Sequence, residues 1–263
     1  MNQPIDYHLD ERGVATLTLN RPDVHNAFDD GMIEAMLECF TALGNASTAR
    51  VLVLKSASKS FSAGADLSWM QRMADYDFDT NLNDAGRMAD MFNALYHLPM
   101  PTLAVVNGAA FGGGVGLVAA CDFALASPKA LFCLSEVALG LVPAVISPYV
   151  VESVGLKSFK RLAMSGERFS ADQAKSMGLV SHLVDEEALE VSLEAMLAQL
   201  LRNGPAAMAA SKTLAHEVAY RPIGEQTKQH TSQLIASIRG SNEGREGIRA
   251  FLEKRSAAWR ENV

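Results

Sequence analysis

Apolar and polar positions alternate in a pattern that predicts a β-α-β unit near the start of the chain. Residues 14–19 (VATLTL) alternate apolar residues with threonine, as in a half-buried strand, and residues 51–54 (VLVL) form a short apolar run, as in a buried strand. Between them, apolar residues recur at helical spacing over 31–43. Similar patterns predict strands at 102–106, 123–126, 131–134 and 179–184, and helices at 83–97, 115–121 and 158–165.

The pattern changes after Asp185, where the strand signals stop and only helix-like stretches follow. Pro205 and Pro222 mark breaks between these helices. We therefore expect an α/β core over residues 1–185 and an all-helical region over residues 186–263. In the last helix an apolar stripe faces either the same chain or a neighbouring one, and it consists of Ile248, Phe251, Leu252 and Trp259.

One segment, residues 98–121, carries no charged residue over 24 positions and is long enough to span a bilayer. Two prolines, Asn107 and five glycines interrupt it. We expect a buried strand, a loop and the start of a helix there, and no contact with a membrane.

The charge balance argues against nucleic acid as a partner. Lys and Arg number 23 and Asp and Glu number 30, which gives a net charge of −7. A protein of this charge has no electrostatic excess with which to follow a phosphate backbone or an anionic membrane. An anionic ligand would have to be held locally, by helix N-termini and single lysines.

The cysteine pattern is typical of a reducing compartment. Cys39, Cys121 and Cys133 are odd in number and widely spaced, which excludes a CxxC pair. The first 13 residues lack the apolar segment of a secretory signal peptide. We therefore expect a cytoplasmic protein. The histidines show no ligand spacing, so we assign no metal.

Two segments of small residues are candidates for ligand binding. They are residues 61–67 (FSAGADL) and 107–117 (NGAAFGGGVGL), and each follows a predicted strand and leads toward a helix. Small residues allow a ligand to approach the backbone closely. Two such turns can aim N–H groups at one oxygen and form an oxyanion hole. The alternative for each segment is a tight turn at a helix start.

Six motifs in order carry a resemblance to a known family. They are LNRPDVHNAF (19–28), FSAGADL, NGxxxGGG, Cys121-Asp122, Ser135-Glu136 followed by LGLVP, and EGxxAFLEKR (246–255). Over nearly its whole length the chain resembles the crotonase (enoyl-CoA hydratase/isomerase) superfamily. The resemblance implies an α/β spiral of ββα units that holds an acyl-CoA site. It also implies a helical C-terminal region that covers the CoA site and forms homotrimers or dimers of trimers.

The resemblance also implies catalytic groups. The N–H groups of Ala65 and Gly113 would form the oxyanion hole for a thioester enolate, and Glu136 would be the acid/base. Members that hydrate usually carry a second glutamate at a position that Gly116 occupies here. One carboxylate would then have to deprotonate water and return a proton, or share this work with an unidentified group.

Coenzyme A contacts carry over from the same motifs. Those near the adenine and pantetheine match Val24, His25, Ala27, Ser62, Ala63, Asp66 and Leu67. Phe251 and Lys254 match a pair that lines the nucleotide end, commonly from a neighbouring chain. The alternative for Lys254 is a solvated lysine at a helix end that binds no ligand. The substrate is carried as a CoA thioester, and no other cofactor is expected.

Three functions remain open on the sequence. The first is hydration of a 2-enoyl-CoA, the second is Δ3–Δ2 enoyl-CoA isomerisation by a single glutamate, and the third is acyl-CoA binding without catalysis. Residues 132–137 and 140–149 look like those of bacterial 3-methylglutaconyl-CoA and γ-carboxygeranoyl-CoA hydratases. This likeness implies a branched, carboxylated substrate of the kind formed in leucine or acyclic terpene breakdown.

Overall fold

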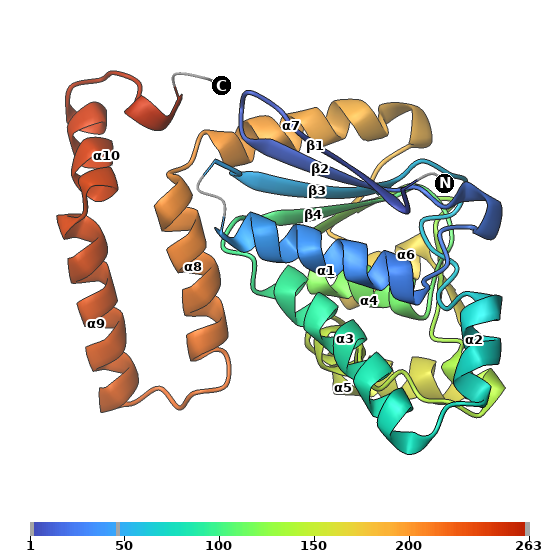
Figure 1. Cartoon of the computed structure of the whole chain (residues 1–263). Coiled ribbons are helices and arrows are strands. Elements are labelled where there is room, and N and C mark those ends of the chain that lie inside the picture. The colour runs from blue at the N-terminus through green and yellow to red at the C-terminus, as the bar shows by residue number, and fades with distance from the viewer. Residues whose placement is uncertain (1–2, 46–47, 261–263) are drawn as a thin grey trace.

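The computed structural model describes residues 3–45 and 48–260, and it has the α/β architecture expected from the sequence (Figure 1). Strand β1 is antiparallel to β2, and the other neighbours in the larger sheet are parallel. The strands of this sheet are, in order, β1 (Ile5–Leu9), β2 (Val14–Leu19), β3 (Val51–Ser56), β4 (Thr102–Val106), β6 (Phe123–Ala126) and β9 (His182–Leu183).

The central strands are buried on both faces, which explains their continuous apolar sequences. In β3, Val51 and Val53 pack on one face against the leucines of α7 (Leu189–Leu201), while Leu52 and Leu54 face the larger core. That core is covered by α1 (Asp30–Asn45), α3 (Phe78–Tyr96) and α4 (Gly113–Ala120), and Figure 1 shows α7 and α1 on opposite sides of the sheet.

A small second sheet brings two distant segments together. Its strands are β5 (Ala110–Phe111), β7 (Leu131–Cys133) and β8 (Arg168–Ser170). Phe111 is in register with Cys133, and the Gly112 N–H donates to the Cys133 carbonyl at 2.9 Å. The short 3-10 helix η2 (Glu136–Leu139) starts three residues after β7. The sheet therefore places the start of α4 beside Glu136.

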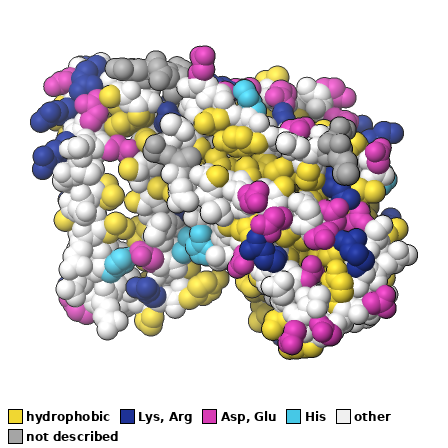
Figure 2. All heavy atoms as spheres, viewed as in Figure 1, with side chains coloured by type: hydrophobic (Ala, Val, Ile, Leu, Met, Phe, Trp, Pro, Cys, Tyr) yellow, Lys and Arg dark blue, Asp and Glu magenta, His cyan; other side chains and the backbone are white. Residues whose placement is uncertain are grey.

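The chain after residue 185 is helical, as predicted, and its last helices extend away from the sheet (Figure 1). Helices α8 (Pro205–Val218) and α9 (Glu225–Gly240) contain no buried residue, and α10 (Asn242–Leu252) contains only Ala250. Figure 2 shows apolar side chains exposed on these last helices and on the core beside them. The Arg50 guanidinium anchors the chain end by donating to the carbonyls of Leu201 and Trp259 at 2.7 and 2.9 Å.

The remaining predicted elements differ from the structure mainly at their ends. The strand expected over 179–184 spans only β9, and the helix expected over 158–165 is the end of the longer α5 (Ser147–Ser165), which is kinked at Gly155. Segment 98–121 contains β4, β5 and α4. No helix in the described ranges is long and apolar enough to cross a membrane. The elements that the pattern missed are β1, β5, β8 and α6 (Ala171–Met177), whereas α2 (Leu67–Ala74) begins where segment 61–67 was expected to lead into a helix.

Candidate active site

A buried asparagine joins the two segments that flank the site. Asn26 is fully buried with a positive φ of 54°, and its Nδ2 lies within 3.1 Å of four oxygens in residues 56–61. Ser62 Oγ donates to the Asn26 carbonyl at 2.8 Å. These bonds fix residues 21–28 against the segment that leads to α2.

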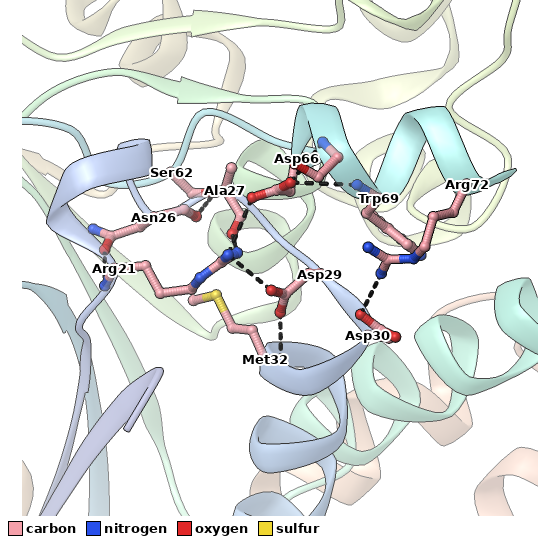
Figure 3. A network of polar contacts seen from close by, with 11 residues as sticks. Arg21, Asn26, Ala27, Asp29, Asp30, Met32, Ser62, Asp66, Trp69 and Arg72 are labelled. Atoms are coloured by element: carbon pink, nitrogen blue, oxygen red, sulfur yellow. Dashed lines mark hydrogen bonds and ion pairs between the residues drawn. The ribbon is translucent and has the colours of Figure 1, made fainter. Parts of the chain in front are cut away.

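Arg21 reinforces the same junction (Figure 3). Its guanidinium pairs with Asp29 at 2.8 Å and with Asp66 at 3.1 Å, and it also donates to the Ala27 carbonyl. The Asp66 carboxylate caps α2 by accepting the N–H of Ser68 at 2.8 Å. Burial opposes ionisation of Asp66, but these N–H donors and Arg21 outweigh burial and lower its pKa.

The segment around Ala65 leaves one backbone donor free. The Phe28 N–H donates to the Gly64 carbonyl at 2.6 Å, and the Asp66 N–H donates to the Phe28 carbonyl at 2.7 Å. Between them, the Ala65 N–H has no acceptor in the described part of the chain. An N–H group held in this way is available to an oxygen of a ligand.

A second free donor lies at the start of α4. Gly112 has φ +50° and ψ −117°, a conformation that requires glycine, and it turns the chain from β5 into the helix. The Gly113 N–H at the first helical position has no acceptor among residues 3–45 and 48–260. A Cβ atom on Gly112 would stand 3.9 Å from Gly64 Cα, so the two turns lie side by side.

The Glu136 carboxylate reaches this same place. Its Oε1 lies 3.1 Å from the position that a Cβ atom on Gly112 would take. Its Oε2 is buried and has no hydrogen-bond partner among the described residues. Burial raises the pKa of Glu136 above the usual range of a glutamate. A carboxyl group whose pKa is raised is suited to taking and returning a proton in catalysis.

Of the seven residues predicted near the adenine and pantetheine, four are exposed and three are not. Val24, His25, Ala63 and Leu67 are exposed on the two joined segments, where the Ala63 N–H donates to the His25 carbonyl at 3.0 Å. The buried residues are Ala27, Ser62 and Asp66, and the Ser62 and Asp66 side chains bond within the protein. Their side chains therefore support the surface that the exposed residues form.

Phe251 and Lys254 lie elsewhere in the chain. Both are exposed at the end of α10, which Figure 1 places across the molecule from α2. The structure does not bring them to the site of their own chain. A role at the CoA site stays a prediction that requires another copy to supply them.

Arg21 and Asn26 have positioning roles that the sequence reasoning missed. The available signal was an asparagine in a Pro-containing loop, because asparagine tolerates positive φ and bonds to nearby backbone. Within the described residues, no three His, Cys, Asp or Glu side chains gather as a metal site would require. The assembled groups are two backbone donors and one half-buried carboxylate, which suit an enolate oxygen and a proton transfer beside it.

Comparisons with known proteins agree with this geometry. A family model described as enoyl-CoA hydratase/isomerase matches residues 10–262. A solved enoyl-CoA hydratase from Shewanella pealeana is 42% identical and superposes with a TM-score of 0.94, covering 97% of this chain and 96% of that one.

Two curated relatives show the range of activities. The 2,3-dehydroadipyl-CoA hydratase of Escherichia coli is 32% identical over 251 residues, covering 94% of each chain. The trans-2-decenoyl-[acyl-carrier-protein] isomerase of Streptococcus mutans is 32% identical over 254 residues, covering 95% of each. The chain therefore belongs to the enoyl-CoA hydratase/isomerase family, the crotonase superfamily that its motifs predicted.

Proposed function

We propose that this protein adds water across the 2,3 double bond of an enoyl-CoA thioester. The observation that carries the proposal is the unpartnered Glu136 carboxylate beside Gly112 and Gly64, at the two turns that present free N–H groups. Membership of the family supports a hydratase-type activity. A protein that only bound acyl-CoA would gain nothing from a half-buried carboxylate with one buried oxygen that no described residue hydrogen-bonds, which is costly to keep.

The proposed reaction uses one carboxylate twice. Glu136 takes a proton from water while the water oxygen forms a bond to C3, and the electron pair of the double bond moves to the thioester oxygen. The N–H groups of Ala65 and Gly113 stabilise the enolate oxygen so formed. Glu136 then gives the proton to C2, so that one water is added and the carboxylate is regenerated. Only water and a proton are transferred, so the reaction requires no cofactor beyond the CoA that carries the acyl group.

We further propose that the acyl group is branched and carboxylated, as in 3-methylglutaconyl-CoA. The resemblance of residues 132–137 and 140–149 to hydratases of such substrates supports this choice. A relative named for 2,3-dehydroadipyl-CoA, the thioester of a dicarboxylic acid, supports it as well. Gly116 in place of a glutamate removes a negative charge from the neighbourhood of Glu136, which favours an anionic acyl end.

Isomerisation is the second candidate, and Gly116 is the observation that favours it. Moving a double bond from C3 to C2 requires only that one base carry a proton from C2 to C4, or back. A single glutamate can do this work, and the Streptococcus mutans relative is named as an isomerase. The two reactions differ in whether water is incorporated.

We also propose that the protein acts in the cytoplasm. Cys39, Cys121 and Cys133 are all free thiols in the structure. Burial raises the pKa of Cys39 to about 11 and that of Cys121 to about 12, so both stay as unreactive thiols. A protein with no disulfide between these cysteines suits a reducing compartment.

Ultraviolet absorbance of the conjugated thioester tests the proposal. Absorbance should fall when the purified protein meets 3-methylglutaconyl-CoA, and kcat/KM should exceed that for crotonyl-CoA at least tenfold, which corresponds to about 1.4 kcal/mol. A preference for crotonyl-CoA would contradict the substrate assignment and leave hydration standing. Unchanged absorbance with every 2-enoyl-CoA, together with rising absorbance from a 3-enoyl-CoA, would replace hydration by isomerisation.

A further inference from the structure

Gly116 lies in the first turn of α4, the helix whose N-terminal glycine faces Glu136. It is one turn along α4 from Gly112, and its N–H donates to the Gly112 carbonyl at 3.2 Å. Side chains on a helix lean toward its N-terminus, which here is the end that faces the Glu136 carboxylate. A side chain at position 116 would therefore lean toward the end of α4 that faces Glu136.

The space that such a side chain needs is already filled. A Cβ atom on Gly116 would overlap Ile146 Cγ2, and it would stand 2.9 Å from both Ile146 Cβ and Phe92 Cε1. Ile146 is 2% exposed and Phe92 is fully buried. Packed interiors leave no room for an added side chain without displacing their neighbours.

This apolar wall is held in place by the elements that follow. The Ile146 carbonyl accepts the Val150 N–H at 3.1 Å in the first turn of α5. The Phe92 ring packs against Tyr149, with ring centroids 5.9 Å apart. The backbone of Ile146 and the ring of Phe92 are therefore both held at the place where a side chain on residue 116 would stand.

We propose that Ile146 determines specificity by keeping the site to one carboxylate, so that Glu136 alone transfers both protons and an acyl-CoA with an anionic end is accepted. The inference rests on the proposed function, because it concerns the charge around that reaction. Two carboxylates and an anionic acyl end would place three negative charges together. Like charges held close together repel one another, and the repulsion is stronger where water is excluded.

The steric part of the proposal is tested by stability. We expect Gly116→Glu to lower Tm by at least about 4 °C, and the large-to-small change Ile146→Gly to lower it as well. In the double variant the two losses should not add, because the space that one change opens is filled by the other. The matched control is Gly86→Glu in α3, where an added Cβ meets no atom within 4 Å, and its Tm should stay close to that of the wild type.

The specificity part is tested with two substrates that differ only by a carboxylate, 3-methylglutaconyl-CoA and 3-methylcrotonyl-CoA. In the ratio of the two kcat/KM values, any loss of activity that affects both substrates equally drops out. We expect this ratio to fall at least tenfold from Ile146→Gly to the double variant Gly116→Glu/Ile146→Gly, and to be unchanged in Gly86→Glu.

Two results would overturn the inference. One is a Gly116→Glu protein that melts like the wild type, because Ile146 would then not exclude a side chain. The other is an unchanged substrate ratio in a folded double variant, because the second carboxylate would then not affect an anionic acyl end. If the wild type hydrates no enoyl-CoA, the proposed function fails, whereas additive Tm losses contradict the contact between positions 116 and 146 independently of any activity.

Discussion

Glu136 and Gly112 fit together so closely that the carboxylate Oε1 lies 3.1 Å from where a Cβ atom on Gly112 would stand. Gly112 also has a φ of +50°, which side chains disfavour. Gly112 therefore has two roles: it makes the turn that begins α4, and it leaves room for the Glu136 carboxylate. The order of the small sheet, in which β5 and β7 are neighbours, brings the two residues together.

Replacing Gly112 with alanine should harm both stability and catalysis. The left-handed backbone is expected to cost about 1–3 kcal/mol, and the methyl group would displace Glu136. We expect kcat/KM to fall at least tenfold, since small misplacements of reacting groups are costly. The control is Gly155→Ala, where φ is +77° but no atom lies within 4 Å of the added Cβ. Urea unfolding and turnover should show a stability loss in both variants and an activity loss only in the first.

The half-buried carboxylate of Glu136 should cost the protein stability at neutral pH. Its pKa is raised in the folded state by burial, so the unfolded chain releases this proton first as the pH rises above about 4.3. Stability from this group is present below that pH and is lost as the pH rises through the folded-state pKa. Glu136→Gln should therefore have a higher Tm than the wild type at pH 7, with the difference shrinking at pH 4.

The exposed Glu187→Gln variant is the control for that measurement, and its Tm difference should stay small at both values of pH. A Glu136→Gln protein that is equally or less stable than the wild type at pH 7 would contradict the raised pKa.

Asn26 should matter for substrate binding although its side chain is fully buried. Asn26→Ala leaves buried oxygens without their donor, at about 1–3 kcal/mol for each group left unsatisfied. It also loosens the hold on residues 56–61, the segment that leads to the Ala65 N–H. We expect lower stability and a higher KM for the CoA ester. The control is Asn81→Ala, an exposed position that loses one bond to the Tyr76 carbonyl. It should change KM by no more than about twofold and the free energy of unfolding by no more than about 0.5 kcal/mol. A normal KM in Asn26→Ala would argue against this positioning role.

The exposed end of α10 predicts an oligomer. Phe251 is 83% exposed and Leu252 is 72% exposed, and a second copy of the chain would cover such side chains. Light scattering at micromolar concentration should report three or six times the chain mass of 28.2 kDa. Phe251→Glu should lower that mass. A monomeric wild type would contradict the prediction and would remove Lys254 as a residue supplied by another chain.

The sequence predicted the strands at the buried centre of the larger sheet and missed strands that are exposed or very short. Strands β2, β3, β4 and β6 have apolar patterns that reflect their burial. Strand β1 (IDYHL) is a largely exposed edge strand held by its backbone ladder to β2, and β5 has only two residues. Neither leaves a hydrophobic pattern to detect.

The candidate site was predictable in its motifs but not in its packing. The sequence shows that position 116 lacks a carboxylate, yet Ile146 and Phe92, which fill its place, are 30 and 24 residues away along the chain. Likewise, the pairing of Gly112 with Gly64 depends on how the two turns meet in space. Contacts of this kind follow from the tertiary fold, and no local pattern reports them.

The most direct test of the proposed function is turnover by Glu136→Gln, measured with 3-methylglutaconyl-CoA alongside the affinity for the same ester. The amide keeps the shape of the side chain and cannot carry the proton. We expect kcat to fall by a factor of at least about 10² while Kd stays within a few-fold of the wild type. A variant that keeps more than about a tenth of the wild-type kcat would contradict the role of Glu136 as the acid/base.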